Sequence, residues 1–279
     1  DASTKDLAFL NASGRSPYAA TLDTFHKAGM NSIPLRGLLP VTVPGAVDGW
    51  FAAHSRHGKL SMPIILEPAI RYARNGYPIT HILSSRIQEA AADLSQFPTS
   101  KNLFLPGGKV PSPGDVLTNP GLAKSLERIA REGRDVFYKG EICREIVKFS
   151  RENGGLLSER DFCETASTWG TPVSTTYRDY TVFETPPNSQ GLAALMILNL
   201  VENYDLSSLG YHSPDHLHWL IEAKKVAFAD RTRYISDPDA AKIPVKELLS
   251  KDYAATRRAL IRRDRAADSS TILPGSFGG

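Results

Sequence analysis

The stretch GLAALMILNLV, residues 191–201, restricts the possible folds of this chain more than any other feature. A helix over these residues carries apolar side chains on nearly every face, so it has no side suited to water. The run is shorter than the roughly 18 residues that a membrane span needs. We therefore expect a core helix packed between other elements, and no membrane span.

Composition and charge narrow the classes of function. The chain has 279 residues, of which 41% are hydrophobic and 23% charged, as in an ordinary globular protein. Its 33 basic and 30 acidic side chains give a net charge of +3, too small an excess to indicate a nucleic-acid partner. Cys143 and Cys163 lack C-x-x-C spacing, so we expect neither a disulfide framework nor a zinc site. No signal-peptide pattern follows Asp1, and the location stays open between cytoplasmic and secreted or periplasmic.

Capping residues and apolar spacing predict a chain rich in helices. The segments with this pattern are 16–29, 46–58, 61–76, 119–133, 139–153, 213–234 and 244–263. Ser158 and Asp161 resemble a shortened capping box that opens a further helical turn. Residues 7–10 and 41–43 are predicted as strands.

One segment departs from helical spacing and alternates from residue to residue, which marks a hairpin. Threonine, tyrosine and valine alternate on both sides of YRDY, which predicts two antiparallel strands joined near Arg178 and Asp179. No repeat, low-complexity segment or linker divides the chain cleanly. We therefore expect residues 1–279 to belong to a single domain without an internal boundary.

Two charged segments near the C-terminus allow more than one interpretation. Asp230, Asp237 and two arginines crowd the segment ADRTRYISDPD, which is either an ion-pair network that pins a loop or a pair of catalytic carboxylates. Neighbouring arginines keep acids ionised and engaged, which favours the network. Further on, four arginines are spaced around one predicted helix, where we expect a solvated surface: Arg257, Arg258, Arg262 and Arg263.

Histidines offer a weak metal signal. His212, His216 and His218 have a spacing that could place two imidazoles on one helix face, as metal ligands require. No further cluster of ligands accompanies them in the sequence. We expect structural or solvated histidines, with no metal and no cofactor.

Arg15 is the candidate binding residue. It lies among the small residues of NASGRSP, just after the predicted strand at 7–10, with no carboxylate nearby in sequence. One interpretation is a solvated turn residue. The other is that small neighbours allow a substrate to approach this cation.

Four long segments, in one order from about Asn11 to Asp239, carry a resemblance to a known family. They are VTVPGAVDGWFAAHSRHGKLSMPIILEPAIRYARNGYPI, GDVLTNPGLAKSLERIAREGRDVFYKGEICREIV, STTYRDYTVFETPPNSQGLAALMILNLVENYDL and AFADRTRYISDPD. The first resembles a V-P-G segment followed by L-x-P-A-I-x-L-A-x-x-G-[FY]-P. The second is similar to Q-P-x-L-A-x-T-L-x-x-I-A-x-x-G-x-x-x-F-Y-x-G. Together they resemble the large subunit of the gamma-glutamyltranspeptidase family.

The resemblance implies an N-terminal-nucleophile hydrolase with an αββα sandwich of the α/β (α+β) class. Such proteins are made as one precursor that cuts itself, and the small subunit then begins with the catalytic threonine. This chain would be the helix-rich large-subunit portion, incomplete and inactive without the small subunit as its partner. No catalytic residue is expected within it, and the threonine nucleophile is expected beyond Gly279.

The resemblance also implies a role for Arg15. The family places an arginine that holds the substrate's α-carboxylate early in the large subunit, after a strand, and Arg15 occupies that place. Here the transpeptidase pattern R-E-x-A-P is replaced by Arg15-Ser16-Pro17, which is two residues shorter and lacks the glutamate. An arginine fork pairs with a carboxylate through two charge-assisted bonds, so Arg15 remains the expected substrate-binding residue.

The sequence therefore leaves three candidate functions. The first is a γ-glutamyltransferase or glutathione hydrolase that cleaves γ-glutamyl amides through an acyl-enzyme. The second is an oxamate-type amidohydrolase or acylase of the same fold, which the shortened Arg15 motif favours. The third is a catalytically inert fragment that serves as an interaction module.

Overall fold

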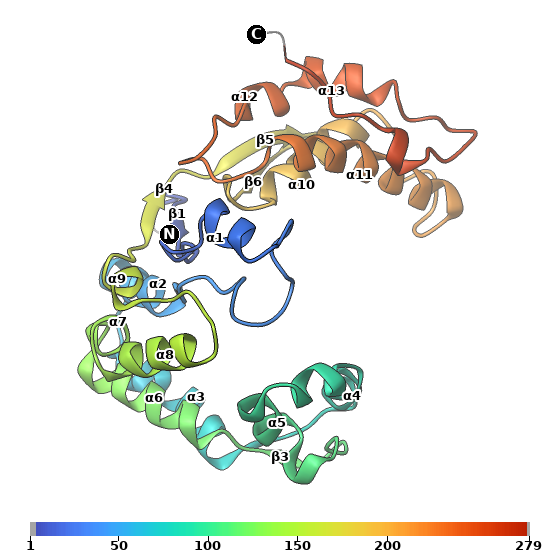
Figure 1. The fold of residues 1–279 in the computed structure, drawn as a ribbon. Coiled ribbons are helices and arrows are strands. Elements are labelled where there is room, and N and C mark those ends of the chain that lie inside the picture. Colours follow the sequence, from blue (N-terminus) through green and yellow to red (C-terminus); the bar gives the residue numbers. More distant parts are fainter. Residues whose placement is uncertain (1–3, 278–279) are drawn as a thin grey trace. The chain divides into compact units, whose positions relative to one another are not determined.

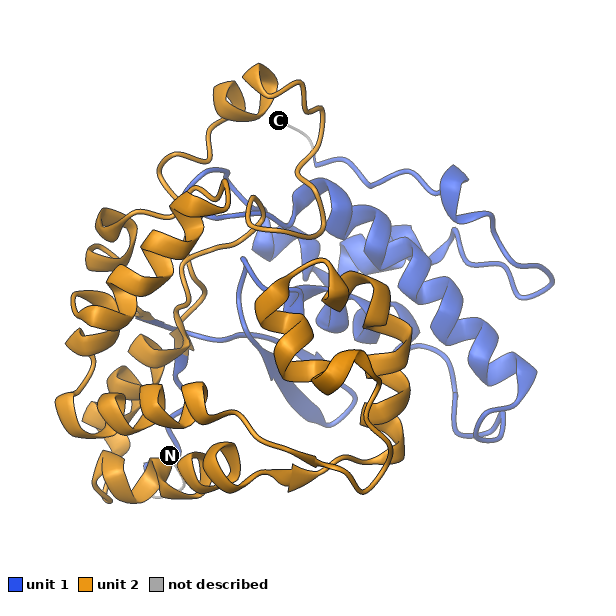
Figure 2. Cartoon of the chain, turned by 60° about the horizontal axis from the view of Figure 1, so that its bottom comes forward, with its two compact units in different colours: residues 1–9, 169–279 blue, residues 10–168 orange. Residues whose placement is uncertain are grey.

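The computed structural model describes residues 4–277. The chain divides into two compact units, one of residues 10–168 and the other of the residues up to 9 together with those from 169 onward (Figure 2). Strands β1 (Phe9–Asn11) and β4 (Thr168–Gly170) span the two points where the chain passes between units. The single domain without an internal boundary stays a prediction.

The unit of residues 10–168 is mostly helical (Figure 1). Its helices are α1 (Leu22–Lys27), α2 (Ala46–His57), α3 (Met62–Asn75), α4 (His81–Ser95), α5 (Pro98–Phe104), α6 (Pro120–Glu132), α7 (Asp135–Tyr138), α8 (Glu141–Glu152) and α9 (Glu159–Cys163), with a 3-10 turn η1 (Pro106–Gly108). Strands β2 (Tyr77–Pro78) and β3 (Val116–Leu117) pair antiparallel.

Local capping signals set most of these helix ends, as the sequence predicts. Asn119 accepts a hydrogen bond from the amide of Leu122 at the start of α6. Gly133 ends this helix with φ = 82°, a conformation that favours glycine. Ser158 and Asp161 form the predicted capping box of α9. These predictions are confirmed because a cap depends only on residues a few positions apart.

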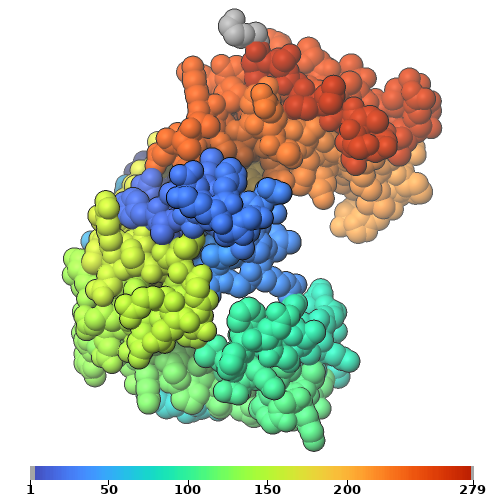
Figure 3. All heavy atoms as spheres, viewed as in Figure 1, coloured from blue at the N-terminus to red at the C-terminus, as the bar shows by residue number. Residues whose placement is uncertain are grey.

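Two apolar clusters form the interior of this unit. In the first, Tyr138 and Phe162 are completely buried, and Val43 and Cys143 pack with them. In the second, side chains of residues 79–117 form a smaller cluster, and Figure 3 shows these blue-green residues gathered together. Its buried members are Ile79, Ile87, Leu105 and Leu117.

In residues 4–9 and 169–277, the described part of the other unit, one hairpin is combined with four helices. Its elements are β5 (Val173–Tyr177), β6 (Tyr180–Glu184), α10 (Gly191–Val201), α11 (Pro214–Tyr234), α12 (Val245–Leu248), α13 (Lys251–Arg258) and the 3-10 turn η2 (Ser269–Thr271). Tyr177 pairs with Tyr180, so the strands turn at residues 178–179, which confirms the predicted hairpin. Helix α10 contacts β5, β6, α11 and α13, and Leu192 and Leu195 are fully buried. The apolar helix is therefore packed between other elements, as its sequence requires.

Three of the predicted elements differ from the structure, two in their bounds and one by its absence. The predicted helix 16–29 begins only at Leu22, because the side chain of Thr21 caps it there. Residues 41–43 form no strand, and the amide of Val43 instead donates a single hydrogen bond to the carbonyl of Arg15. The last predicted helix is divided into α12 and α13, because Ser250 caps a new helix start.

The predicted solvated arginine surface is also wrong in part. Arg257 is 9% exposed and pairs with Asp230 at 3.1 Å. Arg258 donates hydrogen bonds to the carbonyls of Asn199 and Leu200 at 2.7 and 2.8 Å. Arg262 and Arg263 lie beyond α13 and are exposed. Buried acceptors from other segments decide which arginines are solvated, and helical spacing does not reveal them.

None of the helices within residues 4–277 combines the length and the apolar character needed to cross a membrane.

Candidate functional site

Arg15 lies in an extended loop between β1 and α1, and its side chain is exposed. The backbone of this loop is fixed against residues 43–45, because the amide of Val43 donates to the carbonyl of Arg15 at 2.9 Å. A Cβ on Gly14 would lie 1.5 Å from the carbonyl oxygen of Val43, and one on Gly45 would lie 2.1 Å from that of Ala12. Both glycines are therefore needed for the close approach of the two backbones. The small residues around Arg15 serve this packing.

A buried polar network holds residues 44–48, which contact the Arg15 loop. The hydroxyl of Tyr138 donates to the carbonyl of Pro44 at 2.7 Å and accepts the amide of Asp48 at 3.0 Å. Arg134 donates to the carboxylate of Asp48 and to the carbonyl of Thr165, the latter at 2.6 Å. The Arg134 guanidinium also lies 4.4 Å from the centre of the Tyr138 ring. These contacts make Asp48 and Arg134 structural supports of the Arg15 loop.

The charge of Asp48 depends on the same contacts. Burial acts to raise the pKa of Asp48, but hydrogen bonds from Ser167 and Arg134 outweigh it, and the pKa lies below its usual value of 3.8. Burial likewise acts to lower the pKa of Arg134, and the partnership with Asp48 raises it overall. Both groups are therefore held in their charged forms.

Side chains of α9 and of Glu164, which follows it, also lie beside the Arg15 loop. The amide of Tyr18 donates to Asp161 at 2.8 Å, and its hydroxyl donates to Glu164 at 2.5 Å. Arg160 stacks over the Tyr18 ring at 4.3 Å and donates to Glu164 at 2.8 Å. Asp161 also accepts two bonds from Ser158, so its oxygens are occupied by donors of the protein.

The pKa of the Tyr18 hydroxyl depends on the charged groups around it. The hydrogen bond to Glu164 raises the pKa of Tyr18, while the charges of Arg160 and Arg15 act to lower it. Hydrogen bonds from Arg160 and then Tyr18 lower the pKa of Glu164. Tyr18 is therefore a neutral hydroxyl donor near Arg15, and Glu164 is an ionised acceptor.

The Arg15 loop, Val43 and the residues of α9 and just after it line a hollow of about 20 Å³. That volume is enough for about one water molecule and too small for an organic substrate. Its lining is Arg15, Ser16, Tyr18, Val43, Asp161, Glu164 and Thr165. This set contains a cation suited to an anion but no histidine or cysteine. Because Asp161 and Glu164 are also part of the lining, the hollow itself is no anion site, and it holds no histidine or cysteine for catalysis.

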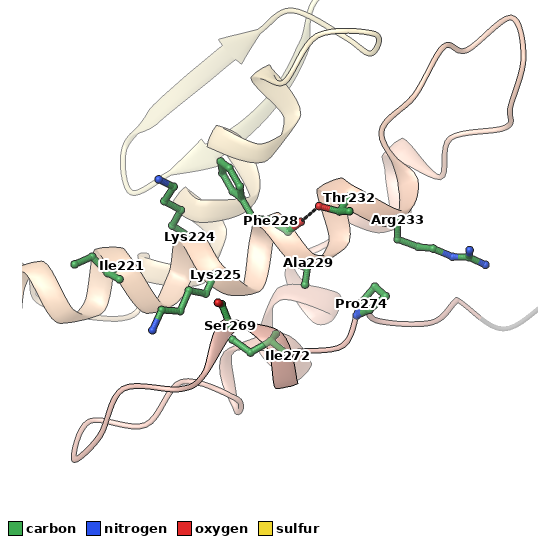
Figure 4. A pocket seen from close by; sticks show the side chains of 10 residues that line it. All are labelled: Ile221, Lys224, Lys225, Phe228, Ala229, Thr232, Arg233, Ser269, Ile272 and Pro274. Carbon is green, nitrogen blue, oxygen red and sulfur yellow. Dashed lines mark hydrogen bonds between the residues drawn. The ribbon is translucent and has the colours of Figure 1, made fainter. Parts of the chain in front are cut away.

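A second hollow, of about 690 Å³, lies in the other unit between α11 and residues 269–274 (Figure 4). Lys224, Lys225 and Arg233 are the charged residues of its lining, which includes no carboxylate or histidine. Lys225 already donates to Glu222 and to the carbonyl of Ala267, both at 2.7 Å. The hollow therefore has no acid–base pair for catalysis.

Other sequence candidates have structural partners. Asp230 is buried against Arg257, which agrees with the predicted ion-pair network rather than with paired catalytic carboxylates. His218 contacts the carbonyl of Arg262 at 2.7 Å through Nε2. Within residues 4–277, no group of three or more His, Cys, Asp or Glu side chains is placed to hold a metal.

Tyr18 and Glu164 were not predicted to lie beside Arg15. They are separated by 146 positions in the chain, so no local pattern relates them. The capping box at Ser158 and Asp161 is the nearest signal, because it shows that α9 begins there. It does not show that Asp161 also accepts the amide of Tyr18.

Comparisons with known proteins relate this chain to one family. The family model described as Gamma-glutamyltranspeptidase matches residues 1–276. The chain is 40% identical over 252 residues to the Glutathione hydrolase-like YwrD proenzyme of Bacillus subtilis (strain 168), covering 90% of this chain and 48% of that protein. It is 40% identical over 240 residues to the Acylase ACY 1 proenzyme of Pseudomonas sp. (strain SE83), covering 86% and 43%.

A solved structure agrees with these sequence matches. The chain is similar to the gamma-glutamyltranspeptidase of Helicobacter pylori with a TM-score of 0.87 and 33% identity, covering 95% of this chain and 78% of that one. The fold expected from the sequence resemblance is therefore confirmed. The chain spans about half the length of the curated relatives that it matches.

Proposed function

Because the chain belongs to the gamma-glutamyltranspeptidase family, we propose that it is the large-subunit portion of a threonine hydrolase or acyltransferase. The complete protein cleaves γ-glutamyl amides such as glutathione through an acyl-enzyme. Both units of this chain belong to one domain of that enzyme. Arg15 binds the carboxylate of the substrate, and the chain supplies neither cofactor nor metal.

The exposed guanidinium of Arg15 on a fixed backbone is the observation that supports this role most. Gly14 and Gly45 allow the Arg15 loop to contact residues 43–45 closely, and the network of Asp48 and Arg134 holds those residues. An arginine whose backbone is fixed loses less freedom when it binds a carboxylate through two charge-assisted bonds.

A small subunit from the same precursor is the proposed partner. The hairpin β5–β6 is a two-stranded sheet, and Tyr180 and Phe183 on it are 74% and 50% exposed. Isolated two-stranded sheets are marginal in water, so further strands are expected to extend it. The matched relatives are proenzymes about twice as long as this chain. The threonine nucleophile belongs to the part beyond Gly279, and the chain alone is inactive.

An amidohydrolase or acylase is the second candidate. The 40% identity to an acylase proenzyme equals the identity to the glutathione hydrolase-like one. The Arg15-Ser16-Pro17 motif also lacks the glutamate and two residues of the transpeptidase pattern. An arginine would serve oxamate equally well, because oxamate also carries a carboxylate beside its amide.

The substrate class is tested with the full-length, processed protein. Hydrolysis of a γ-glutamyl anilide, oxamate and a long-chain N-acyl amide is measured in parallel. The highest kcat/KM is expected for the γ-glutamyl anilide, and a higher value for either other probe would select the amidohydrolase or the acylase. A folded protein that hydrolyses none of the three would support the inert interaction module.

Arg15→Lys tests the binding residue. Loss of one charge-assisted bond, about 1.5–3 kcal/mol, corresponds to a fall of about 10- to 150-fold in kcat/KM, mainly through KM. Arg86→Lys is the matched control, because Arg86 is an exposed arginine of the same unit paired with Glu89. An Arg15→Lys enzyme as active as the control would remove Arg15 from the substrate site.

A further inference from the structure

Helix α11 carries two buried carboxylates and, near its end, a half-buried tyrosine. Glu222 and Asp230 are 2% and 1% exposed, and Tyr234 follows one turn later. Successive residues of a helix are about 100° apart, so Asp230 is turned about 80° from Glu222, and Tyr234 about 40° further. The three side chains therefore follow one broad face of α11 that winds by about 120° from Glu222 to Tyr234.

The C-terminal tail, residues 267–277, lies along this face. The amide of Ala267 donates to Glu222 at 3.0 Å, and that of Gly275 donates to Asp230 at 2.7 Å. Both bonds join residues 45 positions apart, so the tail runs in the same direction as α11. Figure 4 shows the part of the tail that holds Ser269, Ile272 and Pro274 beside the helix.

The bonds to the tail are additional to complete ion pairs. Lys225 pairs with Glu222 at 2.7 Å, and Arg257 pairs with Asp230 at 3.1 Å. Arg257 also donates to the carbonyl of Leu273 at 2.8 Å. Hydrogen bonds to charged groups are stronger than neutral ones. The tail is therefore held by charge-assisted bonds at three points of its backbone.

The last described residues of the tail are held most closely. The hydroxyl of Tyr234 donates to the carbonyl of Gly275 at 2.6 Å. A Cβ on Gly275 would lie 2.1 Å from the hydroxyl oxygen of Tyr253, so a larger residue there requires the tail or the Tyr253 side chain to shift. Phe277 packs on the rings of Tyr234 and Tyr253, with centroids at 5.2 and 4.7 Å.

We propose that Glu222, Asp230, Tyr234, Tyr253 and Arg257 form a tail-binding cluster that positions the precursor's cleavage segment for self-processing. Cleavage by an internal nucleophile requires the reacting atoms to be held in an attack geometry, and small displacements slow it strongly. The bonds at Ala267, Leu273 and Gly275 and the packing of Phe277 fix the path of the tail along α11. The five residues are positioning residues, and the inference rests on the proposed function.

Two variants of the full-length precursor test this role. Gly275→Ala displaces the tail from Tyr253 and is expected to slow processing by about tenfold or more. Tyr234→Phe removes one hydrogen bond to the tail and is expected to slow it by about fivefold. The half-time of precursor conversion is followed on denaturing gels. The kcat/KM of each fully processed variant is expected to stay within about twofold of the parent, because the tail then has no role.

Matched controls separate positioning from general loss of structure. Gly121→Ala adds a Cβ at 3.6 Å from the side-chain oxygen of Asn119, an ordinary contact, and Tyr211→Phe alters a tyrosine that is 84% exposed. Both controls are expected to process at the parent rate. Parent-rate processing of Gly275→Ala and Tyr234→Phe would overturn the inference, as would a parallel fall of processing, kcat/KM and Tm. A parent precursor that never processes would instead overturn the proposed function.

Discussion

The Arg15 loop and the C-terminal tail each lie beside carboxylates, but their charges are arranged in opposite ways. In the loop the cation, Arg15, is exposed, and Asp161 and Glu164 beside it are bound to Tyr18. Along the tail both charges of the Asp230–Arg257 pair are buried. An exposed cation on a fixed backbone suits a ligand, whereas a buried pair suits the attachment of a segment.

Removing a buried charge is the most severe test of this contrast. Asp230→Asn leaves Arg257 buried without its counter-charge, and the expected loss is about 3–5 kcal/mol of unfolding free energy. Urea denaturation of the processed protein measures it. Asp264→Asn, which alters an exposed pair with Arg262, is the control and should cost less than about 1 kcal/mol. Equal losses in the two variants would contradict the buried role of Asp230.

Asp48→Asn tests the support of the Arg15 loop. Asp48 is 7% exposed and accepts bonds from Arg134 and Ser167, so a neutral amide weakens charged hydrogen bonds worth about 1.5–3 kcal/mol. Because the Arg15 loop is attached to residues 43–45, KM is expected to rise as well. Denaturation and steady-state kinetics measure the two effects. A loss of stability without any change in KM would separate the network from the binding site.

Stability should fall in acid because buried carboxylates such as Glu222 and Asp48 have lowered pKa values. Burial acts to raise the pKa of Glu222, but bonds from Lys225 and Ala267 place it below the usual value of 4.5. The unfolded chain therefore binds more protons as the pH falls below about 4.5 for Glu222 and 3.8 for Asp48. Each group contributes at most about 1.4 kcal/mol per pH unit there. The contribution is complete above these values and is lost as the pH falls through the folded-state pKa.

The acid effect is measured by urea denaturation at a series of pH values from 3 to 7. Glu222→Gln should give a shallower slope below about pH 4.5, because one of the titrating groups is absent. A variant with the parent's slope would show that Glu222 contributes nothing to acid sensitivity.

Surface ion pairs should have the smallest effect. Arg86 and Glu89 are 72% and 58% exposed, so Glu89→Gln is expected to change stability by less than about 1 kcal/mol. The same denaturation experiment measures it. A larger change would mean that exposed charges in this protein contribute as much as buried ones.

The sequence alone determined the elements whose signals are local. Asn119 and Gly133 mark the ends of α6, and the alternation around Arg178 marks the hairpin, because capping and turn formation involve residues a few positions apart. The apolar character of residues 191–201 also determined that this helix would be buried. Arg15 was selected by its place in the family order, and its role as a ligand for a carboxylate stays a prediction.

Only the tertiary structure decided which charged side chains are paired. Arg257 and Arg258 have the spacing of a solvated helix surface, yet Asp230, 27 positions from Arg257, accepts one of them in the interior. Tyr18 meets Glu164 across 146 positions, and the tail meets α11 across 45. Pairing between distant segments depends on how they pack. That is why the sequence revealed Arg15 as a cation, and only the fold revealed what holds its loop.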